Sequence, residues 1–179
     1  MEEKENKYAG LAVVVIDVQP PYLAKLDMDT RLALDQNQFE VVSYYARQNV
    51  PVIGIEMEMQ GRTPLLLRRH FKEKPVKKWF RDGFFGTVLE ERLQEKQCTD
   101  LVMIGLFRSE CVYETAGSAS YLGFQVYTTA LLIADYPTIK LKDVVSDDQL
   151  RSICSLSADN KELFSVIEKR KSRGREEEK

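Results

Sequence analysis

The sequence is poor in histidine and contains few cysteines. Its 179 residues include one histidine, His70, and three cysteines, at positions 98, 111 and 154, with no Cys-x-x-Cys spacing. An odd number of scattered cysteines, in a chain long enough to build an apolar core, argues against a disulfide framework. We therefore expect free thiols in a reducing compartment.

Long apolar runs are also missing. The longest, at 11–16 and 101–107, fall well short of the roughly 18 to 20 residues that cross a bilayer. The opening MEEKENKY is charged and is not followed by the apolar stretch of a secretory signal. We expect a cytoplasmic protein with neither a signal peptide nor a transmembrane segment.

Charge of one sign is not in excess. The 26 Lys and Arg residues are balanced by 28 Asp and Glu, which gives a formal net charge of -2. A chain without a broad positive field is a poor candidate for nucleic-acid binding. With 44% hydrophobic residues, the composition is that of a folded domain. We expect one domain over residues 1–167 and a charged, flexible tail over residues 168–179, which lack large apolar residues.

Short apolar runs alternate with helical patterns along the chain. Such alternation predicts an α/β fold with three layers, in which helices cover both faces of an open, mostly parallel sheet of Rossmann-type topology. Ligands of such sheets bind at the carboxyl ends of the strands. The predicted strands are 11–16, 52–57, 101–106 and one or two within 124–134; the predicted helices are 31–48, 88–96, 112–122 and one or two beyond 143.

Asp17 and Cys111 follow two of the predicted strands. A thiol at the start of a helix is stabilised as thiolate by the helix dipole, and a carboxylate at the end of a buried strand must find a partner or act chemically. Both residues also have plain structural interpretations. Most free cysteines are small buried hydrophobes, and aspartate often caps a helix or forms a turn.

Three segments in order resemble the isochorismatase-like cysteine hydrolases: VVVIDVQ at 13–19, KWFRDGFFGTVLEERL at 78–93 and GLFRSECVYETAGSASYLGFQV at 105–126. Lys78 lies six residues before Phe84, and Cys111 lies six residues after Gly105, as in that family. The resemblance implies a catalytic triad of Asp17, Lys78 and Cys111. It also implies a cis peptide between Leu106 and Phe107, with backbone amides of Phe107 and Cys111 as the oxyanion hole.

The activity implied is hydrolysis of an amide or ureide C–N bond in a small molecule through an acyl-cysteine intermediate. Asp17 would accept the thiol proton, and the Lys78 ammonium would favour the thiolate. The alternative is a binding or interaction protein that keeps the fold with little or no turnover. A redox role is disfavoured because no second cysteine neighbours Cys111. The resemblance also implies a homo-oligomer and no cofactor.

Four residues are candidates for substrate binding. Tyr22 and Trp79 would form aromatic walls, Arg108 would bind a carboxylate, and Gln19 would support the site. Glu110, adjacent to the nucleophile, would raise the thiol pKa unless its side chain turns away.

The remaining expectations concern metal and charge. Nicotinamidases of this family carry a metal site of an Asp and several His after the second strand, but residues 56–60 contain no histidine. We therefore expect no metal and no nicotinamidase activity. Residues 62–78 hold seven Lys or Arg against one acid, Glu73. This basic segment favours an anionic substrate, or else forms a solvated surface or a subunit contact.

Overall fold

The computed structural model describes residues 7–177. Its centre is a parallel sheet in which every strand pair among these residues runs in the same direction. This is the predicted fold class, which is confirmed. The strand order is β3 (Val76–Lys78), β2 (Val52–Met57), β1 (Leu11–Ile16), β4 (Asp100–Leu106), β5 (Gln125–Thr129) and β7 (Ser155–Ser157), with β6 (Ile133–Ala134) paired to β4.

The two central strands are buried along their whole length. All six residues of β1 and all seven of β4 are buried, which explains why both are continuous apolar runs rather than alternating ones. Gly105 of β4 has a φ of +148°, and a Cβ placed there would lie 2.1 Å from the carbonyl oxygen of Ile16. Glycine is therefore required where the ends of β1 and β4 approach each other.

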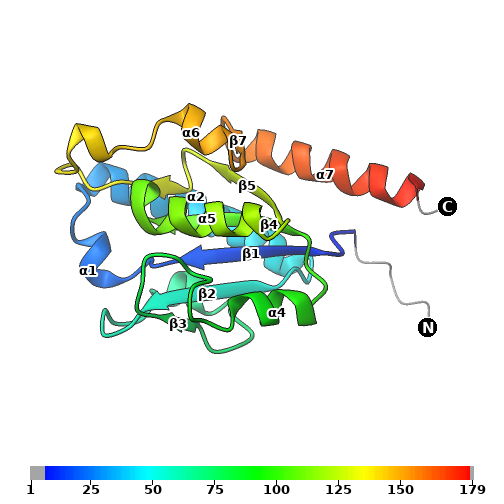
Figure 1. Cartoon of the computed structure of the whole chain (residues 1–179), viewed down its shortest axis with the longest axis horizontal. Coiled ribbons are helices and arrows are strands. Elements are labelled where there is room, and N and C mark those ends of the chain that lie inside the picture. The colour runs from blue at the N-terminus through cyan, green and yellow to red at the C-terminus, as the bar shows by residue number, and fades with distance from the viewer. Residues whose placement is uncertain (1–6, 178–179) are drawn as a thin grey trace.

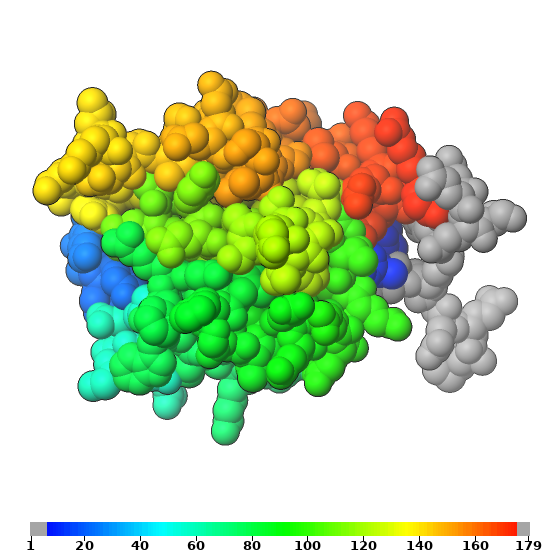
Figure 2. Space-filling view, in the orientation of Figure 1, coloured from blue at the N-terminus to red at the C-terminus, as the bar shows by residue number. Residues whose placement is uncertain are grey.

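Helices cover both faces of the sheet (Figure 1). On one face α2 (Met28–Arg47) packs beside α7 (Asn160–Glu177), with the rings of Tyr44 and Phe164 at 4.4 Å. On the other lie α4 (Leu89–Glu95) and α5 (Tyr113–Tyr121), and residues 79–125 cover most of that face in Figure 2. The connections contain α1 (Pro20–Leu23), α3 (Leu65–Arg68), α6 (Asp147–Arg151), the π-helix η1 (Arg108–Val112) and the 3-10 helix η2 (Leu141–Asp143).

The C-terminal helix passes through the domain boundary predicted at residue 167. Arg170 Nε and Lys171 Nζ contact the carboxylate of Asp100 at 2.6 and 2.7 Å, and Asp100 is buried at the start of β4. Burial alone would raise the pKa of Asp100, but hydrogen bonds and charge from Lys171, Thr99 and Arg170 hold it below its usual value. Residues 168–177 thus continue α7, whereas 178–179, like 1–6, lie outside the described residues. Flexibility of the tail stays a prediction.

Two strands of the sheet are too short to be predicted from the sequence. β3 and β7 have three residues each, which is too short for a periodic pattern, and the sequence analysis missed both. Within residues 7–177, no helix combines the length and the apolar character that crossing a membrane requires.

Candidate active site

The three residues of the predicted triad lie together at one edge of the sheet. Asp17 directly follows β1, Lys78 ends β3, and Cys111 lies in η1 after β4. The Nζ of Lys78 is 2.6 Å from Oδ2 of Asp17, and neither side chain is exposed to solvent. The Cys111 thiol lies close enough to both groups for each of them to shift its pKa. Parallel strands bring these side chains together because their carboxyl ends share one edge.

Backbone groups fix the buried ion pair. Asp17 adopts a left-handed conformation with a φ of +50°, and its Oδ1 accepts a hydrogen bond from the N–H of Met57 at 2.9 Å. Lys78 Nζ donates to the carbonyl oxygen of Arg81 at 2.5 Å. Each charged group therefore keeps a partner besides the other, which a buried ion pair needs to offset its desolvation.

Gln19 forms hydrogen bonds with the backbone beside the triad. Its Nε2 donates to the carbonyl oxygens of Met57 and Gly61 at 3.0 and 2.8 Å, and its Oε1 accepts from the N–H of Met57 at 2.9 Å. Gln19 is fully buried. Its amide is thus bound to the same backbone N–H that holds Asp17, so the structure makes it a supporting residue and not the substrate contact that the sequence analysis also considered.

The thiol of Cys111 is protonated at neutral pH. Burial raises its pKa to about 12; the Asp17 carboxylate also raises it, whereas Lys78 lowers it. Burial likewise raises the pKa of Asp17, against the opposing effects of Lys78, Cys111 and Met57. Lys78 thus favours the thiolate, as expected from the sequence, but burial and the carboxylate outweigh it. The Cys111 side chain is therefore a thiol beside a carboxylate whose own pKa is raised.

This electrostatic balance predicts how Cys111 reacts with iodoacetamide. With a pKa near 12, the rate should rise about tenfold per pH unit from pH 6 to 10 without a plateau, because the thiolate is the nucleophile. Asp17→Asn removes the charge that raises the pKa, so it should speed alkylation at every pH in this range. Peptide mapping of quenched samples measures both, with Cys98, whose pKa is raised to about 11, as an internal control. A plateau near pH 7 would contradict the prediction.

Tyr22 and Trp79, the two aromatic residues predicted to line the substrate site, lie in different environments. Burial raises the pKa of Tyr22 to about 12, and the charges of Asp17, Cys111 and Glu110 add to this effect, so Tyr22 lies beside the triad. Its ring meets that of Phe107 edge to face, with centroids 5.6 Å apart. Trp79 follows Lys78 in the chain but is 69% exposed, and nothing in the structure directs it toward Cys111.

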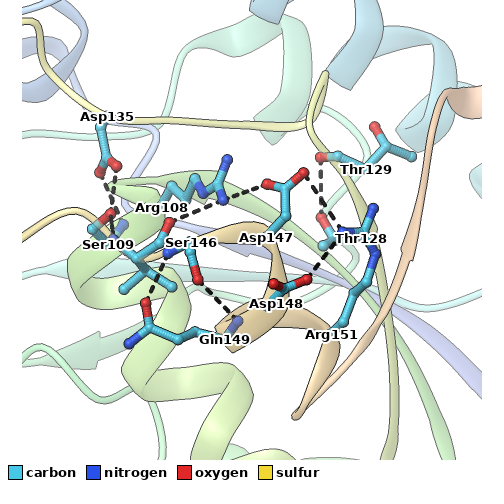
Figure 3. Close-up of polar contacts among 11 residues, drawn as sticks. Arg108, Ser109, Thr128, Thr129, Asp135, Ser146, Asp147, Asp148, Gln149 and Arg151 are labelled. Atoms are coloured by element: carbon cyan, nitrogen blue, oxygen red, sulfur yellow. Dashed lines mark hydrogen bonds and ion pairs between the residues drawn. The ribbon is translucent and has the colours of Figure 1, made fainter.

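The side chain of Arg108 is engaged away from the triad. Its Nη2 donates to the carbonyl oxygen of Val145 at 2.9 Å and contacts Oδ1 of Asp147 at 2.7 Å (Figure 3). Next to it, the N–H and Oγ of Ser109 donate to the carboxylate of Asp135. These contacts tie η1 to the loop before α6. The Nη2 of Arg108 is thus engaged, whereas its buried Nε has no hydrogen-bond partner among residues 7–177. Binding of a substrate carboxylate by Arg108 stays a prediction.

The segment before the nucleophile contains a cis peptide bond, between Leu106 and Phe107. The N–H groups of Glu110 and Val112 both donate to the carbonyl oxygen of Phe107 at 3.1 Å, so neither is free to bind an oxyanion. The side chain of Glu110 turns toward Arg81, whose Nη2 is 3.2 Å from its Oε1.

The sequence analysis missed the contribution of Arg81 and Met57. Arg81 supplies a carbonyl oxygen to Lys78 and a guanidinium to Glu110, and Met57 supplies an N–H to Asp17. Backbone groups carry no residue-type signal, so a motif could not have found these two contacts.

The four lysines of the basic segment do not converge on one site. Lys78 belongs to the site and Lys77 pairs with Glu56 at 2.9 Å. Lys72 and Lys74 line a cavity of about 150 Å³ at the start of β2, the opposite end of that strand from the triad. Among the described residues, no group of three or more His, Cys, Asp or Glu is placed to hold a metal ion.

Comparison of the sequence with family models identifies the class to which this parallel α/β fold belongs. The isochorismatase domain model matches residues 11–138, and the chain belongs to the isochorismatase family. A search of curated proteins finds no significant match.

Solved structures with the same fold include three hydrolases. The N-carbamoylsarcosine amidase of Thermoplasma acidophilum has a TM-score of 0.72 at 17% identity, covering 84% of this chain and 96% of that one. An isochorismatase of Pseudomonas putida has a TM-score of 0.70 at 18% identity, covering 88% and 92%. The YcaC gene product of Escherichia coli, described as an octameric hydrolase of unknown specificity, has a TM-score of 0.70 at 17% identity, covering 86% and 77%. At these identities the likeness is one of fold.

Proposed function

We propose that the protein is a cysteine-dependent hydrolase of an amide or ureide C–N bond in a small molecule. The observation that carries the proposal is the buried Asp17–Lys78 ion pair, with Cys111 close enough for both groups to shift its pKa. A nucleophile, a base and a fixed positive charge are the groups that acyl transfer requires. The activity of the structurally similar Thermoplasma protein, an amidase, supports the same class of reaction.

In the first step Cys111 attacks the carbonyl carbon of the substrate. The thiol proton passes to the Asp17 carboxylate as the Sγ–C bond forms, which avoids a free thiolate in a buried site. The C–N bond of the resulting tetrahedral intermediate then breaks. The leaving ammonia or amine takes the proton from Asp17, and an acyl-cysteine remains.

In the second step water hydrolyses the acyl-cysteine. Asp17 accepts a proton from the attacking water, the C–S bond breaks, and the proton returns to sulfur, which releases the acid and restores the thiol. Lys78 keeps its positive charge throughout and compensates the negative charge that moves between Asp17 and the substrate. The backbone amides of Phe107 and Cys111 are the proposed donors to the oxyanion.

Replacing the nucleophile tests the proposal. Wild type should release ammonia or amine from at least one member of a panel of small amides and ureides, and Cys111→Ser should lower kcat/KM by about a thousandfold or more. Intact-protein mass spectrometry of wild type during turnover should show an adduct that disappears when the substrate is exhausted. Cys98→Ser is the matched control, because Cys98 is also a buried free thiol but precedes β4, at the far edge of the sheet.

Two outcomes would contradict the proposal. If Cys111→Ser turned over the panel as fast as wild type, the nucleophile would be wrong. If wild type turned over no member, the alternative of a binding protein with the same fold would be favoured.

We also propose that the protein is a homo-oligomer and that it acts in the cytoplasm. The octameric state of the structurally similar Escherichia coli protein supports oligomerisation. So does the exposure of Trp79, Phe80 and Phe85, which lie close together in the chain and are each more than half exposed. Mass measurement of the protein in solution determines the number of subunits.

A further inference from the structure

The ammonium of Lys25 is held over three aromatic rings beside the triad. Its Nζ lies 5.6 Å from the ring centroid of Tyr22, 5.3 Å from that of Phe107 and 5.2 Å from that of Tyr136. The rings also pack against one another, Phe107 meeting Tyr22 and Tyr136 edge to face. A cation over ring faces at this separation is attracted by the ring quadrupoles, so Lys25 has a defined position although it is exposed.

Lys25 takes part in none of the ion pairs found among residues 7–177. Three other cations around the site are paired: Lys78 with Asp17, Arg81 with Glu110, and Arg108 with Asp147. The rings orient the Lys25 charge but do not neutralise it. A positive charge that is positioned in advance and lacks a counter-ion can bind an anion with little loss of side-chain entropy.

Two of the three rings connect Lys25 to the reacting atoms. Tyr22 lies close enough to Asp17 and Cys111 for their charges to raise its pKa, and Phe107 precedes Cys111 by four residues at the start of η1. Lys25 therefore stands at the border of the site, one ring away from the triad. An anionic group on a molecule bound at Cys111 can reach it without entering the buried ion pair.

We infer that Lys25, held by Tyr22, Phe107 and Tyr136, is the subsite for a carboxylate of the substrate, so that the protein acts on amides or ureides that carry a carboxylate. This inference rests on the proposed function for the identity of the reaction. It adds one residue that neither motif nor charge count indicated to the two sources of positive charge considered from the sequence, the basic segment and Arg108.

A pair of alkylating reagents tests the subsite without any turnover. Iodoacetate and iodoacetamide attack the same thiolate by the same reaction, and they differ in one negative charge. The ratio of their rates at Cys111 therefore cancels any change in the thiol pKa. In Lys25→Met, which keeps an unbranched side chain over the rings, the iodoacetate-to-iodoacetamide ratio should fall about fivefold relative to wild type, the size of a partly exposed charge contact. Lys25→Arg should keep the wild-type ratio, and the ratio at Cys98 should not change in either variant.

A longer pair, N-(iodoacetyl)glycine and its amide, moves the carboxylate further from the reacting carbon and reports its preferred distance. If neither pair changed its ratio in Lys25→Met, the inference would be overturned. A third reagent, (2-bromoethyl)trimethylammonium, carries a positive charge. If the rate ratios of both anionic and neutral pairs were the same in wild type and Lys25→Met, but this cation reacted faster with Lys25→Met, the rings would bind a cationic substrate that displaces Lys25. Because labelling requires no hydrolysis, an unchanged ratio rejects the subsite, whereas an inactive substrate panel rejects the proposed function.

Discussion

Replacing Lys78 by methionine is expected to lower the free energy of unfolding by about 3 to 5 kcal/mol, because it leaves a buried carboxylate without its counter-charge. Neither Lys78 nor Asp17 exposes its side chain to solvent, and their charged atoms are 2.6 Å apart. The same variant should also lose hydrolytic activity. Urea denaturation, followed by circular dichroism, measures the change in stability.

A second substitution separates the lost charge from the lost packing. Lys78→Met combined with Asp17→Asn removes both charges, so it should recover most of the stability that the single variant loses. Lys7→Met is the matched control. Lys7 pairs with Glu168, the two side chains are 46% and 41% exposed, and such a pair contributes about 1 kcal/mol or less.

The stability of Lys78→Met should also depend on pH in a defined direction. Burial raises the pKa of Asp17 in the folded protein, and loss of Lys78 removes the charge that opposes this rise. A carboxyl group with a raised folded-state pKa contributes stability when protonated, so the deficit of the variant should shrink as the pH falls through that pKa. A deficit below 1 kcal/mol that does not change with pH would show that the two charges are not coupled.

The second large effect is expected from Gly105→Ala. A Cβ at this position would lie 2.1 Å from the backbone oxygen of Ile16, which cannot move away as a flexible side chain could, and the φ of +148° disfavours alanine as well. Overpacking and backbone strain together should cost about 3 kcal/mol or more. Gly105 lies where the ends of β1 and β4 approach each other, and these strands precede Asp17 and Cys111. In the fraction of the variant that remains folded, the rate of Cys111 alkylation should therefore differ from that of wild type.

Gly117→Ala is the matched control, and we expect it to change stability in the opposite direction. Gly117 lies within α5, and a Cβ there would meet nothing within 4 Å. Alanine in a helix interior is favoured over glycine by about 1 kcal/mol, so this variant should be more stable than wild type. Thermal unfolding of both variants under one condition makes the comparison. Equal melting temperatures would contradict the account of Gly105.

The sequence predicts the centre of this fold better than its edges. The predicted bounds of β1 and β2 match the observed ones, Leu11–Ile16 and Val52–Met57, because strands buried on both faces are written as uninterrupted apolar runs. β3 has three residues and no such pattern. The place of Lys78 in the site was therefore expected from the spacing of a family motif, not from secondary structure.

Contacts between distant segments could not be predicted. Arg108 is paired with Asp147, 39 residues further along the chain, and no local pattern contains that information. Lys25 follows a proline turn like any exposed lysine, and its rings come from three separate segments. The pKa of Cys111 depends on burial that exists only in the folded protein, so reasoning from neighbouring charges alone overestimated its acidity.

The ion pairs of α7 have a practical consequence. Asp100, which holds Arg170 and Lys171, begins β4, while Cys111 follows the other end of that strand. Lys7 meets Glu168 on the same helix at 2.8 Å. Seven residues of extended chain, about 20 Å, therefore separate the anchored ends of the described chain from the triad (Figure 1). The protein can be immobilised on a sensor surface through either terminal segment, with the edge that carries Cys111 facing the flowing solution.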